Sequence, residues 1–311
     1  MTEERDGVPL TNLDQTVFEG ATKRDLVDYL DAVSERILPV LADRPLTVMR
    51  ILRGQGPFMQ KNLPKYTPEW VARAKVWADS SKREVTYALC NDRKTLLWFG
   101  NQRAVEYHPA LMPAGWDHPT HLILDLDPPE GGAFSLAIQA AHLVRQALAN
   151  EGLRGAVKTS GAKGVHVFVP IEAHPIEDVA AATRAIAARA ERIDPVLATT
   201  AFIREDREGK VFLDSTRAGG ATVVAAYSPR LRPGLPVSFP VGWDDLDSAT
   251  PMDFTVHNAA ELLAGQDPWT AQMPQPQRLN DDLIAEGHTI PIARVQAMHE
   301  GKRRKRAQKE S

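Results

Sequence analysis

One stretch constrains the fold of this chain more than any other, the segment HLILDLDPPEGG at residues 121–132. Side chains alternate between the two faces of a strand, so the three leucines share one face, and Asp125 and Asp127 share the other. A Pro/Gly turn follows at once. Two carboxylates about 6–7 Å apart at a strand end indicate either a polar end, where Asp favours the turn, or a site for a positive charge.

The same plan recurs in two later stretches, VHVFVP at 165–170 and KVFLD at 210–214. In both, aliphatic residues form one face, and polar or aromatic residues form the other, which carries His166 and Asp214. The aliphatic faces can pack on helices. The acidic face has no obvious helix to cover it, so we expect it to be open or covered by another part of the chain.

The elements around these strands predict an α+β catalytic core of the βαββαβ, ferredoxin-like or RNA-recognition-like kind. In chain order they are a strand at 121–127, a helix at 134–150, strands at 155–160 and 165–171, a helix at 176–193, and strands at 210–215 and 222–228. In this topology the first and third strands are central neighbours. The fourth lies on the other side of the first, which would bring Asp214 beside Asp125 and Asp127.

A smaller αβ module is expected before this core, at about residues 1–118. It would contain a helix from Lys23 to Leu41 capped by Thr22, and strands at 46–52, 84–90 and 94–98. We predict one domain over residues 1–300, with the catalytic core at about 119–250 and a Pro-rich wrap at about 251–300. The end, 301–311, is expected to be a basic disordered tail.

Three carboxylates on one face repel one another unless a positive charge lies among them. Two Mg²⁺ or Mn²⁺ ions about 3.5–4 Å apart fit this need, since hard cations take oxygen ligands. We therefore predict Asp125, Asp127 and Asp214 as metal ligands. His166 is either a structural histidine or, given its place on the acidic face, a residue that contacts a ligand.

The loop TSGAKG at residues 159–164 lacks the Walker A pattern. Ser160 and Lys163 nevertheless offer a hydroxyl and an ammonium beside glycine N–H groups, a set that can hold a triphosphate. An ordinary glycine hairpin is the alternative.

Composition sets wider limits. The formal net charge of −3 divides into +5 for the tail GKRRKRAQKES, which has six Lys/Arg and one Glu, and −8 for the rest. That tail is either a solvated end or an arm that binds phosphates. The single cysteine and the lack of an apolar span or signal core predict a cytoplasmic protein without membrane attachment.

Several ordered motifs resemble the polymerase domain of bacterial DNA ligase D, a member of the archaeo-eukaryotic primase superfamily. They are MQKNLP, EYHPAL, DLDP, KTSGAKGVHVFVPI, REGKVFLD and TVVAAYSPR, and the likeness runs from VPLTNLDQTVF to WDDL at 243–246. It implies a primase–polymerase fold and template-dependent nucleotidyl transfer with two divalent metals, often Mn²⁺ and often with ribonucleotides. Asp125, Asp127 and Asp214 match the family's metal ligands. Ser160, Lys163 and His166 match the residues that hold the incoming triphosphate.

The resemblance adds further site residues. Arg230 matches a phosphate-binding arginine and His108 a histidine near the nucleotide sugar and metal, while Gln60 and Lys61 match a loop near base and template. Break-repair members bind a downstream 5′-phosphate with two lysines. Here Gln15 replaces the first, and Lys23 matches the second.

The function expected from the sequence is a stand-alone DNA-directed nucleotidyltransferase, a DNA/RNA polymerase and possibly a primase. It would add NTPs or dNTPs to primer-template or gapped duplex DNA in repair such as non-homologous end joining. A ligase or end-binding repair protein is a possible partner. The alternatives are a catalytically silent nucleic-acid-binding module and a metal-dependent phosphohydrolase.

Overall fold

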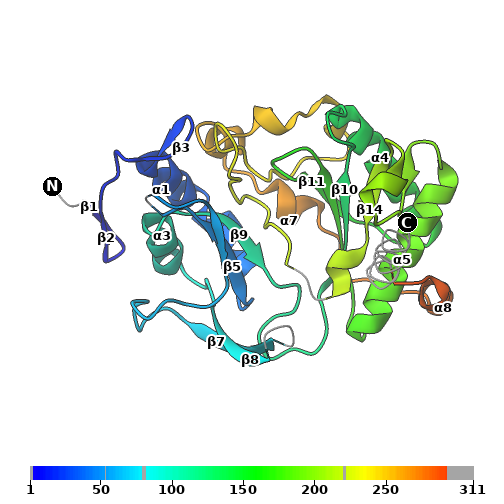
Figure 1. Cartoon of the computed structure of the whole chain (residues 1–311), viewed down its shortest axis with the longest axis horizontal. Helices are drawn as coiled ribbons and strands as arrows, with labels where there is room; N and C mark the ends of the chain where they lie inside the picture. The colour runs from blue at the N-terminus through cyan, green and yellow to red at the C-terminus, as the bar shows by residue number, and fades with distance from the viewer. Residues whose placement is uncertain (1–2, 53, 79–81, 220–221, 293–311) are drawn as a thin grey trace, which may run out of the picture. The chain divides into compact units, whose positions relative to one another are not determined.

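The computed structural model in Figure 1 describes residues 3–52, 54–78, 82–219 and 222–292. The expected basic tail at 301–311 lies outside the described residues. The chain divides into two compact units. The first comprises Met1–Asp117, Lys158–Ala162 and Gly220–Gln272, and the second comprises His118–Val157, Lys163–Gly219 and Met273–Ser311.

The second unit contains most of the sheet that the sequence predicted. Its strands, in spatial order, are β11 (Ala156–Thr159), β12 (Val165–Pro170), β10 (His121–Asp127), β14 (Val211–Asp214) and β13 (Ala198–Thr199). Strand β10 pairs antiparallel with both β12 and β14, and β13 pairs parallel with β14. The expected neighbours of the first strand are therefore confirmed, with the third strand on one side and the fourth on the other.

Two helices pack on this sheet, α4 (Phe134–Asn150) and α5 (Ile176–Ile193) (Figure 1). Both agree in extent with the helices expected from the sequence. The sheet's aliphatic face is fully buried, as the 0% exposure of Leu124 and Val167 shows, and it provides the hydrophobic burial that stabilises the unit. Helix α8 (Asp281–Thr289) packs against α5.

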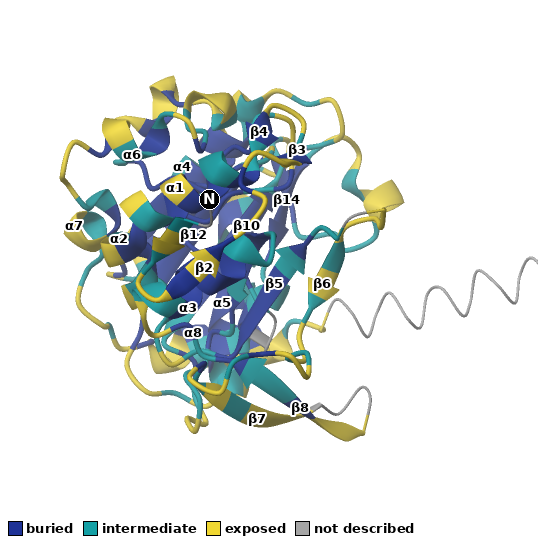
Figure 2. Cartoon of the chain, turned by 90° about the vertical axis from the view of Figure 1, so that its left-hand side faces the viewer, coloured by how far each residue is buried: buried dark blue, intermediate teal, exposed yellow. Residues whose placement is uncertain are grey.

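The first unit is built around strand β5 (Leu46–Arg50), which pairs antiparallel with three strands. The strands are β1 (Glu3–Arg5), β2 (Val8–Leu10), β3 (Thr16–Phe18), β4 (Ala21–Thr22), β5, β6 (Phe58–Gln60), β7 (Arg73–Ala78), β8 (Arg83–Ala88) and β9 (Ala104–Pro109). The helices are α1 (Lys23–Ala32), α2 (Ser34–Leu41), α3 (Arg93–Asn101), α6 (Ala259–Leu262) and α7 (Pro268–Gln272). Figure 2 shows β5 mostly in the colour of buried residues, whereas the β7–β8 hairpin is largely teal and yellow.

Thr22 caps α1 as expected, in a capping box with Asp25. The single helix predicted from Lys23 to Leu41 is instead two helices that meet at Val33, which has φ −99° and ψ 7°. A hydrophobic stripe continues across the break, with Leu30 and Ile37 both fully buried. For this reason the sequence pattern reads as one helix.

Two expected strands are wrong. Residues 94–98 lie in helix α3, because Asp92 caps its first turn by accepting a hydrogen bond from Thr95 N at 2.7 Å. Residues 222–228 form no regular strand, and Thr222 makes an isolated bridge with Ala110. Backbone bonds such as Ala225 N to Tyr107 O at 2.9 Å hold this segment at separate points instead.

Among the residues described, none of the helices has the length and apolar character needed to cross a membrane.

Candidate active site

The register of the second unit's sheet places three of the predicted site residues in one row. On β10, Asp125 pairs with His166 of β12 and with Asp214 of β14. Residues directly opposite each other across antiparallel strands have side chains on the same face, with Cβ atoms about 4.5–5.5 Å apart. The observed pairing therefore confirms that these residues share one face of the sheet, as the sequence predicted.

Asp125 has a cationic or polar partner at each carboxylate oxygen. Oδ1 lies 3.1 Å from Nε2 of His166. Oδ2 accepts a hydrogen bond from Nη2 of Arg217 at 3.0 Å, and the same nitrogen lies 3.4 Å from Oδ2 of Asp214. Sequence reasoning missed Arg217, although its position three residues after Asp214, in the turn that follows the strand, was a usable signal.

Asp127 is the third acid. Burial raises its pKa, and the like charges of Asp125 and Asp214 raise it further, against the opposing effect of Lys163 and Arg217. Burial is the largest cause of this rise, and the two neighbouring carboxylates add to it. Such a cluster binds an added cation favourably, because the cation relieves the repulsion.

The chemistry of this set fits a divalent metal. Carboxylate oxygens are the ligands that Mg²⁺ and Mn²⁺ prefer, and the acids come from adjacent strands. In the described part of the chain, no three acidic, histidine or cysteine side chains are already grouped so as to hold an ion. The guanidinium of Arg217 pairs with both Asp125 and Asp214, so a metal ion bound between these acids would compete with it.

Removing this guanidinium should therefore change metal affinity. We expect Arg217→Ala to tighten Mn²⁺ binding roughly fivefold, since about 1 kcal/mol of competing ion pairing is lost. Without metal the variant should have a lower melting temperature, which Mn²⁺ restores. Titration followed by electron paramagnetic resonance measures the affinity. Arg192→Ala, which breaks a 2.8 Å ion pair with Glu286 elsewhere in the unit, is the control.

Weaker Mn²⁺ binding in the Arg217→Ala variant would contradict this reading. It would mean that the guanidinium supports the ion-binding geometry instead of competing with the ion.

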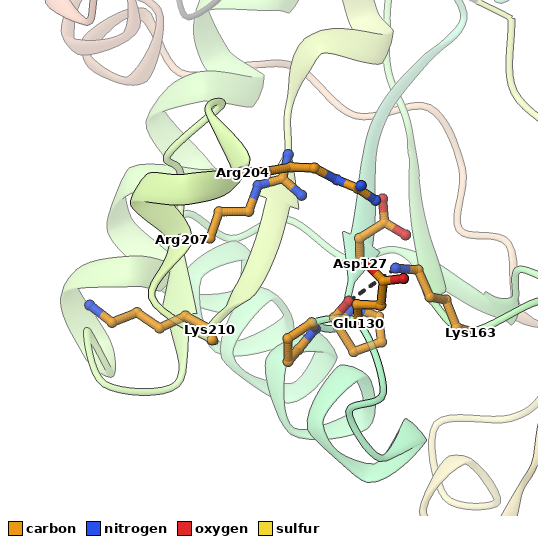
Figure 3. Close-up of a pocket in the computed structure, with 9 residues that line it drawn as sticks. Asp127, Glu130, Lys163, Arg204, Arg207 and Lys210 are labelled. Carbon is orange, nitrogen blue, oxygen red and sulfur yellow. Dashed lines mark hydrogen bonds between the residues drawn. The ribbon is translucent and has the colours of Figure 1, made fainter.

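A cavity of about 230 Å³ opens beside Asp127. Four basic and two acidic side chains line it, namely Asp127, Glu130, Lys163, Arg204, Arg207 and Lys210. Figure 3 shows Lys163 and Arg204 directed toward Asp127, with the Lys163 ammonium donating a hydrogen bond to the Pro128 carbonyl at 3.3 Å. This excess of positive charge suits phosphate oxygens. Arg207 begins the quoted motif REGKVFLD and Arg204 lies three residues before it, but neither arginine was predicted as a site residue.

The first unit holds a second group of predicted residues. Arg230 donates a hydrogen bond from Nη1 to the Ser160 carbonyl at 2.5 Å. His108 lies on β9, and its Nε2 is 2.8 Å from Oε2 of Glu106. The same Glu106 oxygen is 3.2 Å from Nε of Arg230. One buried glutamate, unforeseen from the sequence although it is the first residue of the quoted EYHPAL motif, thus joins His108 to Arg230.

Burial and neighbouring charges determine the protonation states of Glu106 and His108. Burial alone would raise the pKa of Glu106, but the His108 hydrogen bond, the Arg230 charge and a backbone N–H hold it at about 2. Burial lowers the pKa of His108, and this effect outweighs the opposing effect of Glu106. At neutral pH, Glu106 is therefore an anion and His108 is neutral.

The DNA-binding residues suggested by the resemblance lie in the first unit. Lys23 is buried, with its ammonium donating to the Thr11 carbonyl at 2.5 Å. Gln60 ends β6 and accepts a hydrogen bond from Arg50 at 2.5 Å. Lys61 follows it and is exposed.

Comparison with known proteins identifies the family. The family model described as LigD, primase-polymerase domain, matches residues 22–269, which is most of the chain. The chain belongs to the LigD primase-polymerase family.

The chain is similar to longer proteins of this family. This chain is 33% identical over 264 residues to the bifunctional non-homologous end joining protein LigD of Bacillus subtilis, and the match covers 82% of this chain and 42% of the relative. It is 36% identical over 256 residues to the multifunctional non-homologous end joining DNA repair protein LigD of Mycobacterium tuberculosis, covering 77% of this chain and 33% of the relative. The chain thus spans less than half the length of both relatives.

A solved structure is similar as well. The polymerase domain of Mycobacterium tuberculosis ligase D in complex with DNA has a TM-score of 0.77 and 32% identity, covering 88% of this chain and 100% of that domain. The α+β primase–polymerase fold expected from the sequence is therefore confirmed.

Proposed function

We propose that this chain is a DNA-directed nucleotidyltransferase that extends a primer end or fills short gaps during break repair. The observation that carries the proposal is the pairing of Asp125 with Asp214 on adjacent strands, with Asp127 two residues further along. Family membership and the likeness to a polymerase domain in complex with DNA support it. Cooperation with a ligase or end-binding protein is part of the proposal, because the similar protein of Bacillus subtilis is a bifunctional non-homologous end joining protein.

In this reaction a primer 3′-hydroxyl attacks the α-phosphate of an incoming nucleotide in line, and pyrophosphate leaves. Asp125, Asp127 and Asp214 would hold two Mg²⁺ or Mn²⁺ ions. Bound there, such ions would lower the pKa of the attacking hydroxyl and would neutralise charge on the phosphates. His166 orients Asp125 by its 3.1 Å contact.

Several side chains would bind the triphosphate. Lys163 and Arg230 are the cations proposed for its oxygens, where charge-assisted hydrogen bonds contribute about 1.5–3 kcal/mol each. Ser160 adds a hydroxyl. His108, neutral and buried, can contact the sugar, and a ribonucleotide preference is proposed from the family resemblance alone.

Extension of a labelled primer across a short gap tests the proposal. The reaction should require template, should stop without divalent metal, and should be measured with rNTPs and dNTPs and with Mn²⁺ and Mg²⁺. Nucleotide addition that ignores the template base would contradict template direction. Release of inorganic phosphate from nucleotides without any primer would favour a phosphohydrolase on the same acidic face.

The region around Lys23 bears on how the enzyme recognises gaps. Burial, and then the charge of Arg103, lowers the pKa of Lys23 to about 8. Arg103 itself donates to the Thr16 carbonyl at 2.5 Å. Arg24 pairs with Glu3 at 2.8 Å. Arg103 is therefore better placed than Arg24 to supply the positive charge that Gln15 lacks.

We expect the wild type to prefer a downstream 5′-phosphate by less than tenfold, about 1.4 kcal/mol. Arg103→Gln should abolish the preference and Gln15→Lys should increase it. Lys23 is a cation below pH 8 and neutral above it, so the preference should fall as pH rises through about 8.

Gap-filling rates with and without the 5′-phosphate at pH 7 and pH 9 measure this. The exposed Lys65→Gln variant separates a general loss of positive charge from a local one. A tenfold or larger preference that survives in Arg103→Gln would show that another cation completes the pocket.

A further inference from the structure

Glu106 is a buried carboxylate of the first unit, and both of its oxygens have partners. Its exposure is 6%. Oε1 accepts a hydrogen bond from the Leu231 backbone N–H at 2.8 Å. Oε2 lies 2.8 Å from Nε2 of His108 in a hydrogen bond and 3.2 Å from Nε of Arg230 in an ion pair that is not aligned as a hydrogen bond. Taking a carboxylate out of water is costly unless such partners compensate it, so these contacts hold Glu106 in one place.

The contact with His108 decides which ring nitrogen carries the proton. An ionised carboxylate can only accept hydrogen bonds. Because His108 is neutral and its Nε2 lies against Glu106, Nε2 must carry the hydrogen. Nδ1 is then unprotonated and can accept a hydrogen bond from a hydroxyl.

Two contacts hold the Arg230 guanidinium. Its Nε lies 3.2 Å from Oε2 of Glu106 as an ion pair, without hydrogen-bond alignment, and its Nη1 donates to the Ser160 carbonyl at 2.5 Å. Among the described contacts, Nη2 is not needed for either of these interactions, which leaves its donors for a phosphate oxygen. The Arg230 backbone is held too, since its N–H donates to the Pro236 carbonyl at 2.7 Å.

We propose that Glu106 is a positioning residue for nucleotide binding, which holds His108 with Nδ1 as a hydroxyl acceptor and Arg230 as a phosphate donor. The inference rests on the proposed function, because the ligand is taken to be a nucleoside triphosphate that offers a sugar hydroxyl and phosphate oxygens. Glu106 acts through its two neighbours and does not itself contact the nucleotide.

Glu106→Gln tests this with little change in size. The glutamine amide can donate to Nε2, so the His108 proton should move to Nδ1, which then can no longer accept. We expect the tautomer to switch in ¹⁵N-histidine spectra, with the His108 signals identified by their loss in His108→Gln. The KM for nucleotide and the Kd of a fluorescent NTP should rise at least tenfold, with primer-template affinity within twofold of wild type.

Asp267→Asn is the matched control. Asp267 is also a hydrogen-bonded carboxylate of the first unit and accepts from the Tyr227 hydroxyl at 2.5 Å. Its replacement should lower the melting temperature but leave the His108 tautomer and the nucleotide KM unchanged.

Two results would overturn the inference. One is a wild-type His108 with its proton on Nδ1, which can be seen even if Glu106→Gln does not fold. The other is a Glu106→Gln variant with switched tautomer and nucleotide Kd within twofold of wild type. The spectra and equilibrium binding need no turnover, so a wild type that binds nucleotide but fails to extend a primer would contradict the proposed function and leave this inference standing.

Discussion

Asp125→Asn and Asp214→Asn should each lower the rate of nucleotide incorporation by roughly a hundredfold to a thousandfold, since several kcal/mol of metal-borne charge stabilisation is lost. Asparagine keeps the size of the side chain and removes its charge. The two residues face each other across β10 and β14, so either change halves the charge of the same pair. Primer extension at saturating nucleotide and DNA measures the loss.

Stability should respond much less than activity. Asp125→Asn loses an ion pair with Arg217 and a contact with His166, but it also relieves repulsion with Asp214 and Asp127. These effects oppose each other, so we expect the free energy of unfolding to change by about 1 kcal/mol or less. A large activity loss with an unchanged melting temperature separates a reacting group from a structural one.

The chain offers a matched control in the same unit. Asp178 of α5 lies 2.7 Å from Nε2 of His288, a carboxylate–histidine pair like that of Asp125 and His166. Asp178→Asn should leave incorporation unchanged. Wild-type incorporation in both Asp125→Asn and Asp214→Asn would remove these residues from the metal site.

The part of this site that alternation determines could be predicted from the sequence. Period-two patterning in three stretches put Asp125, His166 and Asp214 on one face, and the βαββαβ order made their strands neighbours. Both steps depend only on strand geometry and topology. The observed register agrees residue by residue.

The parts that were missed depend on tertiary contacts. Arg217 reaches the acids from a 3₁₀ turn, Thr216–Gly219, where no simple period applies. Glu106 shares its strand face with His108 by alternation, but nothing in the sequence indicates that Arg230, 124 positions later, meets it. The prediction of a strand at 94–98 was wrong for a local reason. The cap at Asp92 begins a helix there, although the apolar run is also compatible with a strand.

We expect replacement of Gly164 to lower the rate of nucleotide incorporation about as much as replacement of the acids does. A Cβ at this position would lie 2.4 Å from the Leu126 carbonyl oxygen and 3.6 Å from Oδ1 of Asp127. The first of these contacts is with the backbone of β10, which cannot rotate away as a flexible side chain can. Gly164→Ala must therefore displace either the end of β10 or the loop that carries Lys163.

Both displacements act on the candidate site. Overpacking of this kind costs about 1–3 kcal/mol of stability. A shift of about 1 Å in a positioned group can lower a rate by about a hundredfold. We therefore expect Gly164→Ala to lower incorporation about a hundredfold even in the fraction that remains folded, with KM for nucleotide raised because Lys163 moves.

Substitutions at two other glycines separate the effect of steric crowding from the effect of being close to the candidate site. Gly56→Ala meets nothing within 4 Å and should behave as wild type. Gly287→Ala would bring a Cβ to 1.9 Å from the Ala181 carbonyl oxygen. It should lower the melting temperature by loosening α8 from α5, yet leave kcat of the folded enzyme unchanged. If Gly164→Ala instead matched Gly287→Ala, losing stability but keeping kcat and KM, the close approach of this loop to β10 would serve folding alone.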